Sequence, residues 1–411
     1  MEQVLINGTQ STISQTDSKY CGIYANTDWQ ATENIRQQCI PCSGAISDLR
    51  VELTVAPGAG TSHTFTLRLN GAGTALTVTI SDAATSGSDA VNSVNVVAGD
   101  LVCLEATPVG AFPPWPASAQ AEWTLKFTGG TAGESIVLGT SHTSVGGTVY
   151  APISHNDEVN GTELESRQVI PTNGNLKSLF VDQDVAAGGG GYIYTLRLNG
   201  ADTALTVTIN NPNTTGNDVA HTVPVVAGDI VAMSMVRIAG IIVDPYIHYG
   251  MVFEPDIDGE SLILGGTWSP LDDTNTEYNY LGMGYIGDAW TVTEASRYNL
   301  AQECTLKKLF LLLSAAPGAG NSYQFMVRLN AGNTALLVTI ADAAVTGNNV
   351  ADDVAIADDD YVTLQVIPID IPTVVTVYWG LVGYIPAGAP PTGIQDKSAH
   401  MGSKLVAAGI I

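Results

Sequence analysis

Positive charge is scarce in this sequence. There are 15 Lys and Arg against 40 Asp and Glu in 411 residues, which gives a formal net charge of −25 at pH 7. Charged residues make up 13% of the chain, against about a quarter in a typical soluble domain, so Thr, Ser, Asn, Gly and Ala must form most of the surface. No basic stripe is present to neutralise phosphates, and an anionic membrane would repel the chain. We therefore expect neither a nucleic-acid partner nor insertion into a membrane.

Long apolar segments and a secretory start are also lacking. The longest apolar runs, such as residues 309–313, have the length of a strand, whereas a helix that spans a bilayer needs about 20 apolar residues. The first residues, MEQVLINGTQ, contain neither a basic n-region nor an apolar h-region. This start predicts either a lost signal or a protein made in the host cytoplasm and released by lysis on a particle.

The motifs of common enzymes are missing from the sequence. Its six His residues show neither H-x-H nor H-x3-H spacing, and it has no G-x-S-x-G elbow, P-loop or dinucleotide fingerprint. The pair Glu163 and Glu165 has residue types suited to acid–base catalysis, but such pairs arise freely among 40 acidic residues. We therefore expect a protein without catalytic activity.

Two short segments have some character of a metal site. Cys39-Ile-Pro-Cys42 has the spacing of half a zinc site or of a redox pair, but the chain has only five Cys and the other repeats described below have no such pair. Asp256-Ile-Asp258-Gly-Glu260 begins like a calcium loop and lacks the later bidentate glutamate. We expect ordinary thiols, a polar linker, and neither metal nor cofactor.

One hairpin sequence occurs three times in the chain. Residues 66–80, TLRLNGAGTALTVTI, and residues 195–209, TLRLNGADTALTVTI, differ at one position, and MVRLNAGNTALLVTI follows at 326–340. Apolar residues alternate with Thr, Arg and Asn, which is the period of a half-buried strand. The Asn-Gly segment between the runs tolerates positive φ and therefore favours a tight reversal.

The repeat extends well beyond the hairpin. Its arginines stand at 68, 197 and 328, so the steps are 129 and 131 residues. Steps of this length indicate duplicated domains, because solenoid repeats are roughly 20–50 residues long. Each repeat holds about eight short strand-like runs between Gly, Asn, Asp and Pro turns, with no convincing helix. We predict an all-β chain of three tandem antiparallel β-sandwich domains of jelly-roll type, at 1–130, 131–258 and 259–384, followed by a tail at 385–411.

Polar residues that recur in all three repeats are interpreted as parts of the fold. The recurring aspartates each follow a turn and precede an apolar strand, where a carboxylate can bond the turn backbone. The recurring arginines are expected to pair with a carboxylate such as Glu33 or Glu294 across a strand. The aspartates are Asp100, Asp229 and Asp360; the arginines are Arg36, Arg167, Arg297, Arg68, Arg197 and Arg328.

Aromatic residues and the tail are the candidate contact sites. The third repeat is rich in aromatic side chains between 266 and 298, and the first has the turn Pro113-Pro-Trp115-Pro. Such side chains can stack on sugars or anchor a protein contact, and alternation would instead bury about half of them in the sandwich. The candidate contact residues are Trp268, Tyr278, Tyr280, Tyr285 and Trp115. The candidate docking residues of the tail are Leu405, Val406, Ile410 and Ile411, which could add a strand to a neighbour or dock in a groove.

The order of these motifs resembles a known family. The segments Ala56-Pro-Gly-Ala-Gly60, Phe65-Thr-Leu-Arg-Leu-Asn-Gly71 and Val97-Ala-Gly-Asp100 are similar to a β-sandwich module of tailed phages, prophages and environmental viral sequences. The likeness covers all three repeats, is weakest in the upstream part of the middle copy and in the altered turn of the third, and brings no catalytic residues with it. It implies a virion-associated protein that decorates a capsid or forms a short fibre.

Two functions are therefore expected from the sequence. The first is a non-enzymatic structural protein on the surface of a bacteriophage virion, either a capsid decoration protein or a short head fibre, with other virion proteins as partners. The alternative is a tail-fibre or adhesin subunit that binds host cell-surface glycan. Three near-equal domains could arrange themselves about a threefold axis, and the chain could also form a homo-oligomer.

Overall fold

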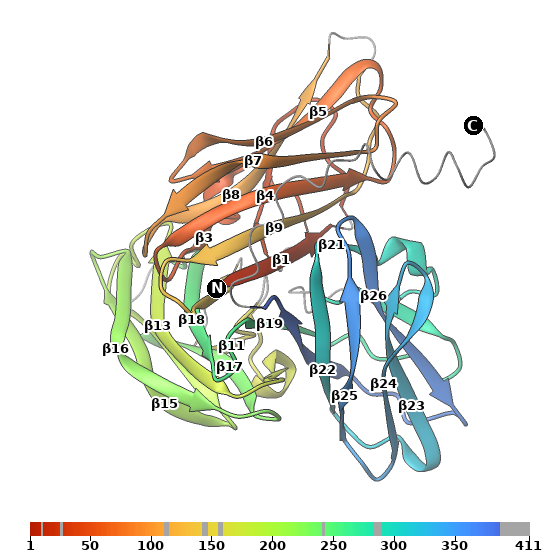
Figure 1. Ribbon diagram of the computed structural model, residues 1–411. Helices are drawn as coiled ribbons and strands as arrows, with labels where there is room; N and C mark the ends of the chain where they lie inside the picture. The colour runs from red at the N-terminus through yellow and green to blue at the C-terminus, as the bar shows by residue number, and fades with distance from the viewer. Residues whose placement is uncertain are drawn as a thin grey trace, which may run out of the picture.

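The computed structural model describes residues 1–9, 11–24, 28–110, 115–141, 147–154, 159–240, 243–282 and 289–386. Figure 1 shows three β-sandwiches that meet near the N-terminus, one coloured red to yellow, one yellow to green and one teal to blue. We call them module 1, module 2 and module 3. The prediction of an all-β chain of three antiparallel sandwiches is confirmed.

Each module contains the same succession of elements. Module 1 consists of β1 (Glu2–Gly8), β2 (Lys19–Cys21), η1 (Glu33–Ile35), β3 (Gln38–Cys39), β4 (Gly44–Leu53), β5 (Gly58–Leu69), β6 (Ala72–Asp82), β7 (Ser86–Val96), β8 (Leu101–Val109) and β9 (Ala121–Gly129). Module 2 consists of β10 (Ser135–Ser141), β11 (Thr148–Ala151), η2 (Glu163–Ser166), β12 (Gln168–Val169), β13 (Gly174–Gln183), β14 (Gly191–Leu198), β15 (Ala201–Asn210), β16 (Thr215–Val225), β17 (Ile230–Ile238) and β18 (Ile247–Pro255). Module 3 consists of β19 (Glu260–Thr267), β20 (Glu277–Asn279), η3 (Glu294–Ser296), β21 (Asn299–Ala301), β22 (Cys304–Leu313), β23 (Gly318–Leu329), β24 (Gly332–Asp342), β25 (Thr346–Ile356), β26 (Asp360–Ile369) and β27 (Val377–Tyr384).

The strand order is that of a jelly roll. In module 1 one sheet runs β1-β9-β4-β7 and the other β2-β8-β5-β6, with β3 beside β8. With the eight main strands lettered B to I in chain order, these are the sheets B-I-D-G and C-H-E-F, which two nested Greek keys produce. Modules 2 and 3 repeat the order strand for strand.

The repeated hairpin forms as its sequence predicts. In module 1, Thr66 on β5 faces Thr77 on β6, and their hydroxyl oxygens lie 2.8 Å apart. Asn70 and Gly71 make the reversal with φ of +50° and +80°, the left-handed conformation that a tight hairpin turn requires. The alternate residues Leu76, Val78 and Ile80 of β6 are buried between the sheets.

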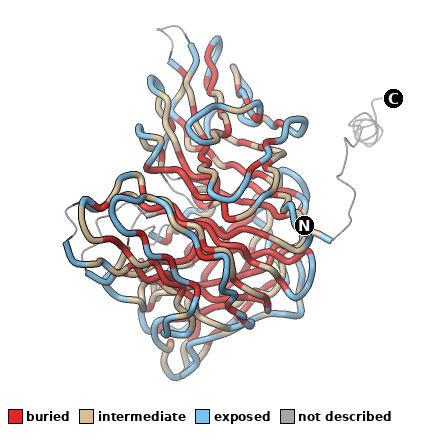
Figure 2. Tube along the Cα trace, turned by 90° about the vertical axis from the view of Figure 1, so that its left-hand side faces the viewer, coloured by how far each residue is buried: buried red, intermediate tan, exposed pale blue. Residues whose placement is uncertain are grey.

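The three hydrophobic cores are joined through the first strand of each module. On β1, Leu5 points into the core of module 1, whereas Val4 and Ile6 on the opposite face belong to the core of module 3. The outer residues of β10, Ile136 and Leu138, lie in the core of module 1. The outer residues of β19 lie in the core of module 2 and are Leu262 and Leu264. Each module thus inserts its first strand against the preceding one, and the third contact closes a ring with approximate threefold symmetry. Figure 2 shows buried chain both inside the sandwiches and where they meet.

A second contact at each junction is made by the short third strand of each module, which is β3, β12 or β21. β3 of module 1 packs on β10 and β18 of module 2, β12 packs on β19 and β27 of module 3, and β21 packs on β1 and β9 of module 1. The approach is close, because a Cβ at Gly250 would lie 2.1 Å from the Cys39 carbonyl oxygen and one at Gly380 would lie 2.0 Å from that of Val169. Glycine at these positions lets one module's backbone reach the next module's sheet.

The centre of the ring breaks the symmetry. A side-chain amide binds the same loop in each module: Gln38 accepts from the Tyr24 N–H at 3.0 Å, Gln168 from the Ser154 N–H at 3.0 Å, and Asn299 from the Gly282 N–H at 3.1 Å. The equivalent residues are therefore Tyr, Ser and Gly. Tyr24 is buried and its hydroxyl donates to the Leu262 carbonyl of module 3 at 3.0 Å, while a Cβ on Gly282 would meet Ile6 at 2.6 Å. The three equivalent positions at the centre are therefore occupied by one large residue, Tyr24, and two small ones, Ser154 and Gly282.

Candidate functional site

The repeated aspartates fix turns between strands. One carboxylate oxygen of Asp100 accepts from the Val97 N–H at 2.8 Å and the other from the Asn70 side-chain amide at 2.8 Å. Asp229 and Asp360 make the same two bonds in their own modules. In each module the carboxylate holds the turn between the seventh and eighth strands, which is the β7–β8 turn in module 1, against the repeated hairpin, as predicted.

The hairpin arginines hold a cluster of three side chains in each module. Arg68 lies 2.8 Å from Glu33 and sits over the ring of Tyr20 with its guanidinium carbon 5.8 Å from the ring centre. The other modules repeat the cluster with Arg197, Glu163 and Tyr150, and with Arg328, Glu294 and Tyr278. The hydrogen bond to Glu33 raises the pKa of Arg68, so the guanidinium stays charged at any physiological pH. The expected carboxylate partners are confirmed for this set.

The expectation of a carboxylate partner is confirmed for Arg36 among the upstream arginines, although the partner differs from the one suggested. Arg36 is fully buried and pairs with Asp28, not with Glu33, which is engaged by Arg68. Arg297 donates to the Ala289 carbonyl at 2.8 Å. Counting back two residues from the equivalent amides Gln38, Gln168 and Asn299 places Ser166, not Arg167, at the matching position of module 2. The first residue of the 3-10 helix lies five positions before the amide in all three modules, so the arginine of module 2 stands one residue later than the arginines of modules 1 and 3.

The aromatic candidates do not form one open platform. Trp268 and Tyr278 are half-buried, and the Tyr278 ring lies beneath Arg328. Tyr280 is buried beside Arg297, with 5.5 Å between the guanidinium carbon and the ring centre. Trp115 is exposed in the β8–β9 loop. Tyr285 and the tail residues Leu405, Val406, Ile410 and Ile411 lie outside the described residues, so their roles stay predictions.

The five cysteines are free thiols, so Cys39 and Cys42 are not joined by a disulfide. Burial raises the pKa of Cys42 to about 12, and Cys39, Cys21 and Cys103 shift in the same direction for the same reason. Such thiols stay protonated and react slowly. Across the described ranges, no group of three or more His, Cys, Asp or Glu is placed to hold a metal ion.

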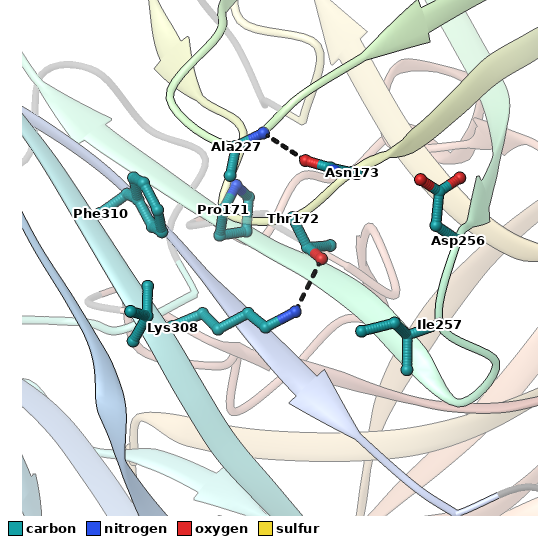
Figure 3. Close-up of a pocket in the computed structure, with 9 residues that line it drawn as sticks. Pro171, Thr172, Asn173, Ala227, Asp256, Ile257, Lys308 and Phe310 are labelled. Carbon is teal, nitrogen blue, oxygen red and sulfur yellow. Dashed lines mark hydrogen bonds between the residues drawn. The ribbon is translucent and has the colours of Figure 1, made fainter.

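A cavity of about 200 Å³ lies at the junction of modules 2 and 3 (Figure 3). Its walls are Pro171, Thr172, Asn173, Ala227, Asp256, Ile257, Lys308, Phe310 and Val350. The Lys308 ammonium points to Thr172 and donates to its hydroxyl at 3.0 Å, and it also donates to Glu260 at 2.9 Å. Burial raises the pKa of Glu260, but bonds from Lys308, Thr172 and Lys307 outweigh it and hold the pKa below the ordinary value. The charge of Lys308 is therefore balanced by Glu260 within the junction. Glu260 belongs to the segment 256–260 that resembled a calcium loop, and in the structure it forms this ion pair.

A second cavity, of about 280 Å³, lies between the start of β1 and the end of β27. It is bounded by Glu2 at the start of β1, by Tyr384 and Pro386 after β27, and by Lys126 and Cys304. At the other two junctions a linker connects the corresponding strands, at residues 130–134 and 256–259.

One pair of facing positions, on β4 and β9 of module 1 and on the equivalent strands of modules 2 and 3, carries different side chains at the three junctions. At junction 1–2, Asp182 faces His248 across the sheet; burial and the nearby Asp184 raise the pKa of Asp182 to about 6, and burial lowers that of His248 to about 4. At junction 3–1, burial raises the pKa of Glu122 well above its usual value, against the opposing effect of Arg297. Junction 2–3 is apolar there, with Leu312 and Tyr378 packed on Val169. None of these side chains lines either of the two cavities described above.

No helix in the described part of the chain is long and apolar enough to cross a membrane. The sequence matches no protein-family model, and no curated protein is detectably similar to it.

Proposed function

We propose that the chain is a non-enzymatic structural protein on the surface of a bacteriophage particle, as a capsid decoration protein or a short head fibre. The observation that carries this proposal is the closed ring of three jelly rolls, in which β1, β10 and β19 each pack into the core of a neighbouring module. A single chain with approximate threefold symmetry suits the threefold positions of a symmetric shell. The likeness of the three repeats to a phage module supports the same role.

The use made of the repeated polar residues gives further support. The aspartates bind turns and the hairpin arginines bind glutamates, so the repeated residues serve the fold in each module. The net charge of −25 keeps such a protein soluble and separate before it meets a particle. A surface protein of this kind needs neither a cofactor nor a membrane.

Electron microscopy of particles assembled with and without this protein tests the proposal. We expect extra density of three lobes on the outer surface of the shell or at the base of a fibre, present only when the protein is present. Particles that are identical in both preparations would refute a structural role. Density at the distal tip of the tail would favour the adhesin alternative.

Partial exposure of Trp268 and Tyr278 keeps the glycan-binding alternative testable. Binding on a glycan array that Trp268→Ala abolishes, with an unchanged melting temperature, would establish it. A lower melting temperature without any sugar binding would assign Trp268 to the fold.

A further inference from the structure

Two equivalent loops expose a large apolar side chain. The β8–β9 loop is tied to the β4–β5 loop by the Ala117 N–H, which donates to the Pro57 carbonyl at 2.8 Å, and the β26–β27 loop is tied by the Thr373 N–H, which donates to the Pro317 carbonyl at 2.8 Å. Trp115 lies two residues before the first bond and Ile371 two residues before the second. Their side chains are 42% and 68% exposed. Loops that are fixed to the sandwich by the same bond therefore present an apolar side chain at the same place in modules 1 and 3.

Ile371 is held there at a structural cost. Its φ is +57°, and it is the single β-branched residue with positive φ in the described part of the chain. This backbone region is strained for a β-branched side chain and free of strain for glycine. Because Ile371 is exposed, burial in its own module does not offset the strain.

The charge around these loops limits what can bind. At least nine of the fifteen Lys and Arg already pair with carboxylates of the chain: Arg36, Arg50, Arg68, Lys126, Lys177, Arg197, Lys307, Lys308 and Arg328. The charge left for a partner is thus almost wholly negative, with Asp370 directly beside Ile371. A complementary surface has an apolar socket with Lys or Arg at its rim. A second copy of the chain carries the same charge of −25 and an anionic bilayer is also negative, so both are repelled.

We propose that Trp115 and Ile371 are anchors that dock the ring onto a protein shell whose subunits repeat around a threefold axis, each offering an apolar socket rimmed by basic residues. This inference rests on the proposed function and names its contact surface. The approximate threefold symmetry of the ring turns the two anchors to face identical sockets, so that one copy of the chain engages at least two subunits. Anchors of this kind contribute most of the energy of an interface, and two linked contacts bind far more tightly than either alone.

Binding of the purified chain to particles assembled without it tests the inference. The variants are Trp115→Ser, Ile371→Gly and the double variant, and the matched control is Val91→Ser, which removes a side chain that is 88% exposed on β7. We expect each single variant to weaken binding about tenfold or more, the double variant to weaken it further, and the control to bind as the unmodified chain. Rising salt should weaken binding of the unmodified chain, because the sockets are rimmed by opposite charge.

The melting temperature separates docking from folding. Ile371→Gly relieves the strain at φ +57°, so we expect this variant to melt at a higher temperature while it binds less tightly. A residue with a purely structural role would not combine these two changes. Sedimentation of the free chain detects self-association, which we expect to be absent.

The outcomes are distinguishable. Equal binding of all variants overturns the inference and leaves the proposed function standing, whereas an unmodified chain that does not bind the particles overturns both. Self-association that Ile371→Gly abolishes would assign the loops to a second copy of this chain and also overturn the inference.

Discussion

The buried carboxylate of Asp89 shows how one side chain shapes an edge strand. It accepts from the Thr77 N–H at 3.0 Å, the Val91 N–H at 3.1 Å and the Asn92 N–H at 3.0 Å. These bonds hold the irregular middle of β7 against β6. Asp218 does the same in module 2, and Asn349 takes the place in module 3, where its oxygen accepts from the backbone and its amide donates to the Leu337 carbonyl.

Removal of this acceptor should destabilise module 1. We expect Asp89→Ala to lower the free energy of unfolding by about 2 kcal/mol, because three backbone N–H groups lose a charged partner. Asp89→Asn should cost less, since module 3 uses Asn at this position. Chemical denaturation of the three proteins measures the difference, and an equal loss for both variants would contradict the account.

The pH dependence of this site has a defined sign. Burial raises the pKa of Asp89, but bonds from Asn92, Thr77 and Val91 outweigh it and leave the pKa lowered. Its stabilising contribution is thus complete above the unfolded value of about 3.9 and is lost as the pH falls through the folded value.

Asp182 at junction 1–2 has the opposite sign. Its folded pKa of about 6 lies above the unfolded value, so the ionised carboxylate destabilises the folded chain above pH 6, and protonation removes that penalty as the pH falls. We expect Asp182→Asn to raise the free energy of unfolding by about 1 kcal/mol at pH 8, once the partial exposure of the group is allowed for, and to have little effect near pH 3, below the unfolded pKa of about 3.9. Thermal melts at the two pH values measure this, and an equal gain at both would refute it.

Residue roles could be predicted from sequence where the local context defines them. Asp100 follows a glycine and precedes an apolar strand, and that context identifies a turn acceptor. Asp89 stands in the middle of a polar segment, where nothing local indicates a bulge. Ile371 was missed because neither the left-handed conformation nor the exposure of an isoleucine can be read from the adjacent letters Asp-Ile-Pro.

At the scale of elements, the first strand of each module carries more information than strand periodicity suggests. The hairpin strands alternate, and their sequence predicts one buried face. The first strands instead contain continuous apolar runs at 4–6, 136–138 and 262–264, the pattern of a strand buried on both faces. This signal marks the junctions, although it does not say which neighbour covers the outer face. That pairing depends on the fold of the whole chain.

Glycine in the last strand of modules 2 and 3 should be indispensable for the junctions. We expect Gly380→Ala to lower the free energy of unfolding by about 2–3 kcal/mol, because the new Cβ would meet the Val169 carbonyl at 2.0 Å and force the modules apart. Module 1 has Thr124 at this position, fully buried, so a side chain is accepted where β21 approaches.

The natural threonine supplies the control. Thr124→Ala should have a smaller effect on unfolding than Gly380→Ala, although both substitutions place the same residue at equivalent positions. Small-angle scattering should show a larger radius of gyration for Gly380→Ala, and an unchanged radius and stability would contradict the close approach.

At the scale of the whole molecule, the modules share their cores and so should unfold together. Val4 and Ile6 stand at the start of the chain and are buried in the core of module 3, while Tyr24 of module 1 bonds to β19. Loss of any one module therefore exposes apolar surface on both neighbours. Three independent sandwiches on a string would behave differently, because each would melt at its own temperature.

Ile6→Asp tests this coupling most directly. The substitution places a charge in the core of module 3 from a strand that belongs to module 1, at an expected cost of about 4 kcal/mol. We expect calorimetry to show one transition for the unmodified chain, and hydrogen exchange of the variant to speed up in β22–β27 as well as in β1 and β9. The control Val91→Ser changes an exposed side chain of module 1 and should leave exchange in module 3 untouched. Several separate transitions in the unmodified chain, or faster exchange confined to module 1 in Ile6→Asp, would show that the ring is not the cooperative unit, and a rigid threefold match to a particle would then lose its physical basis.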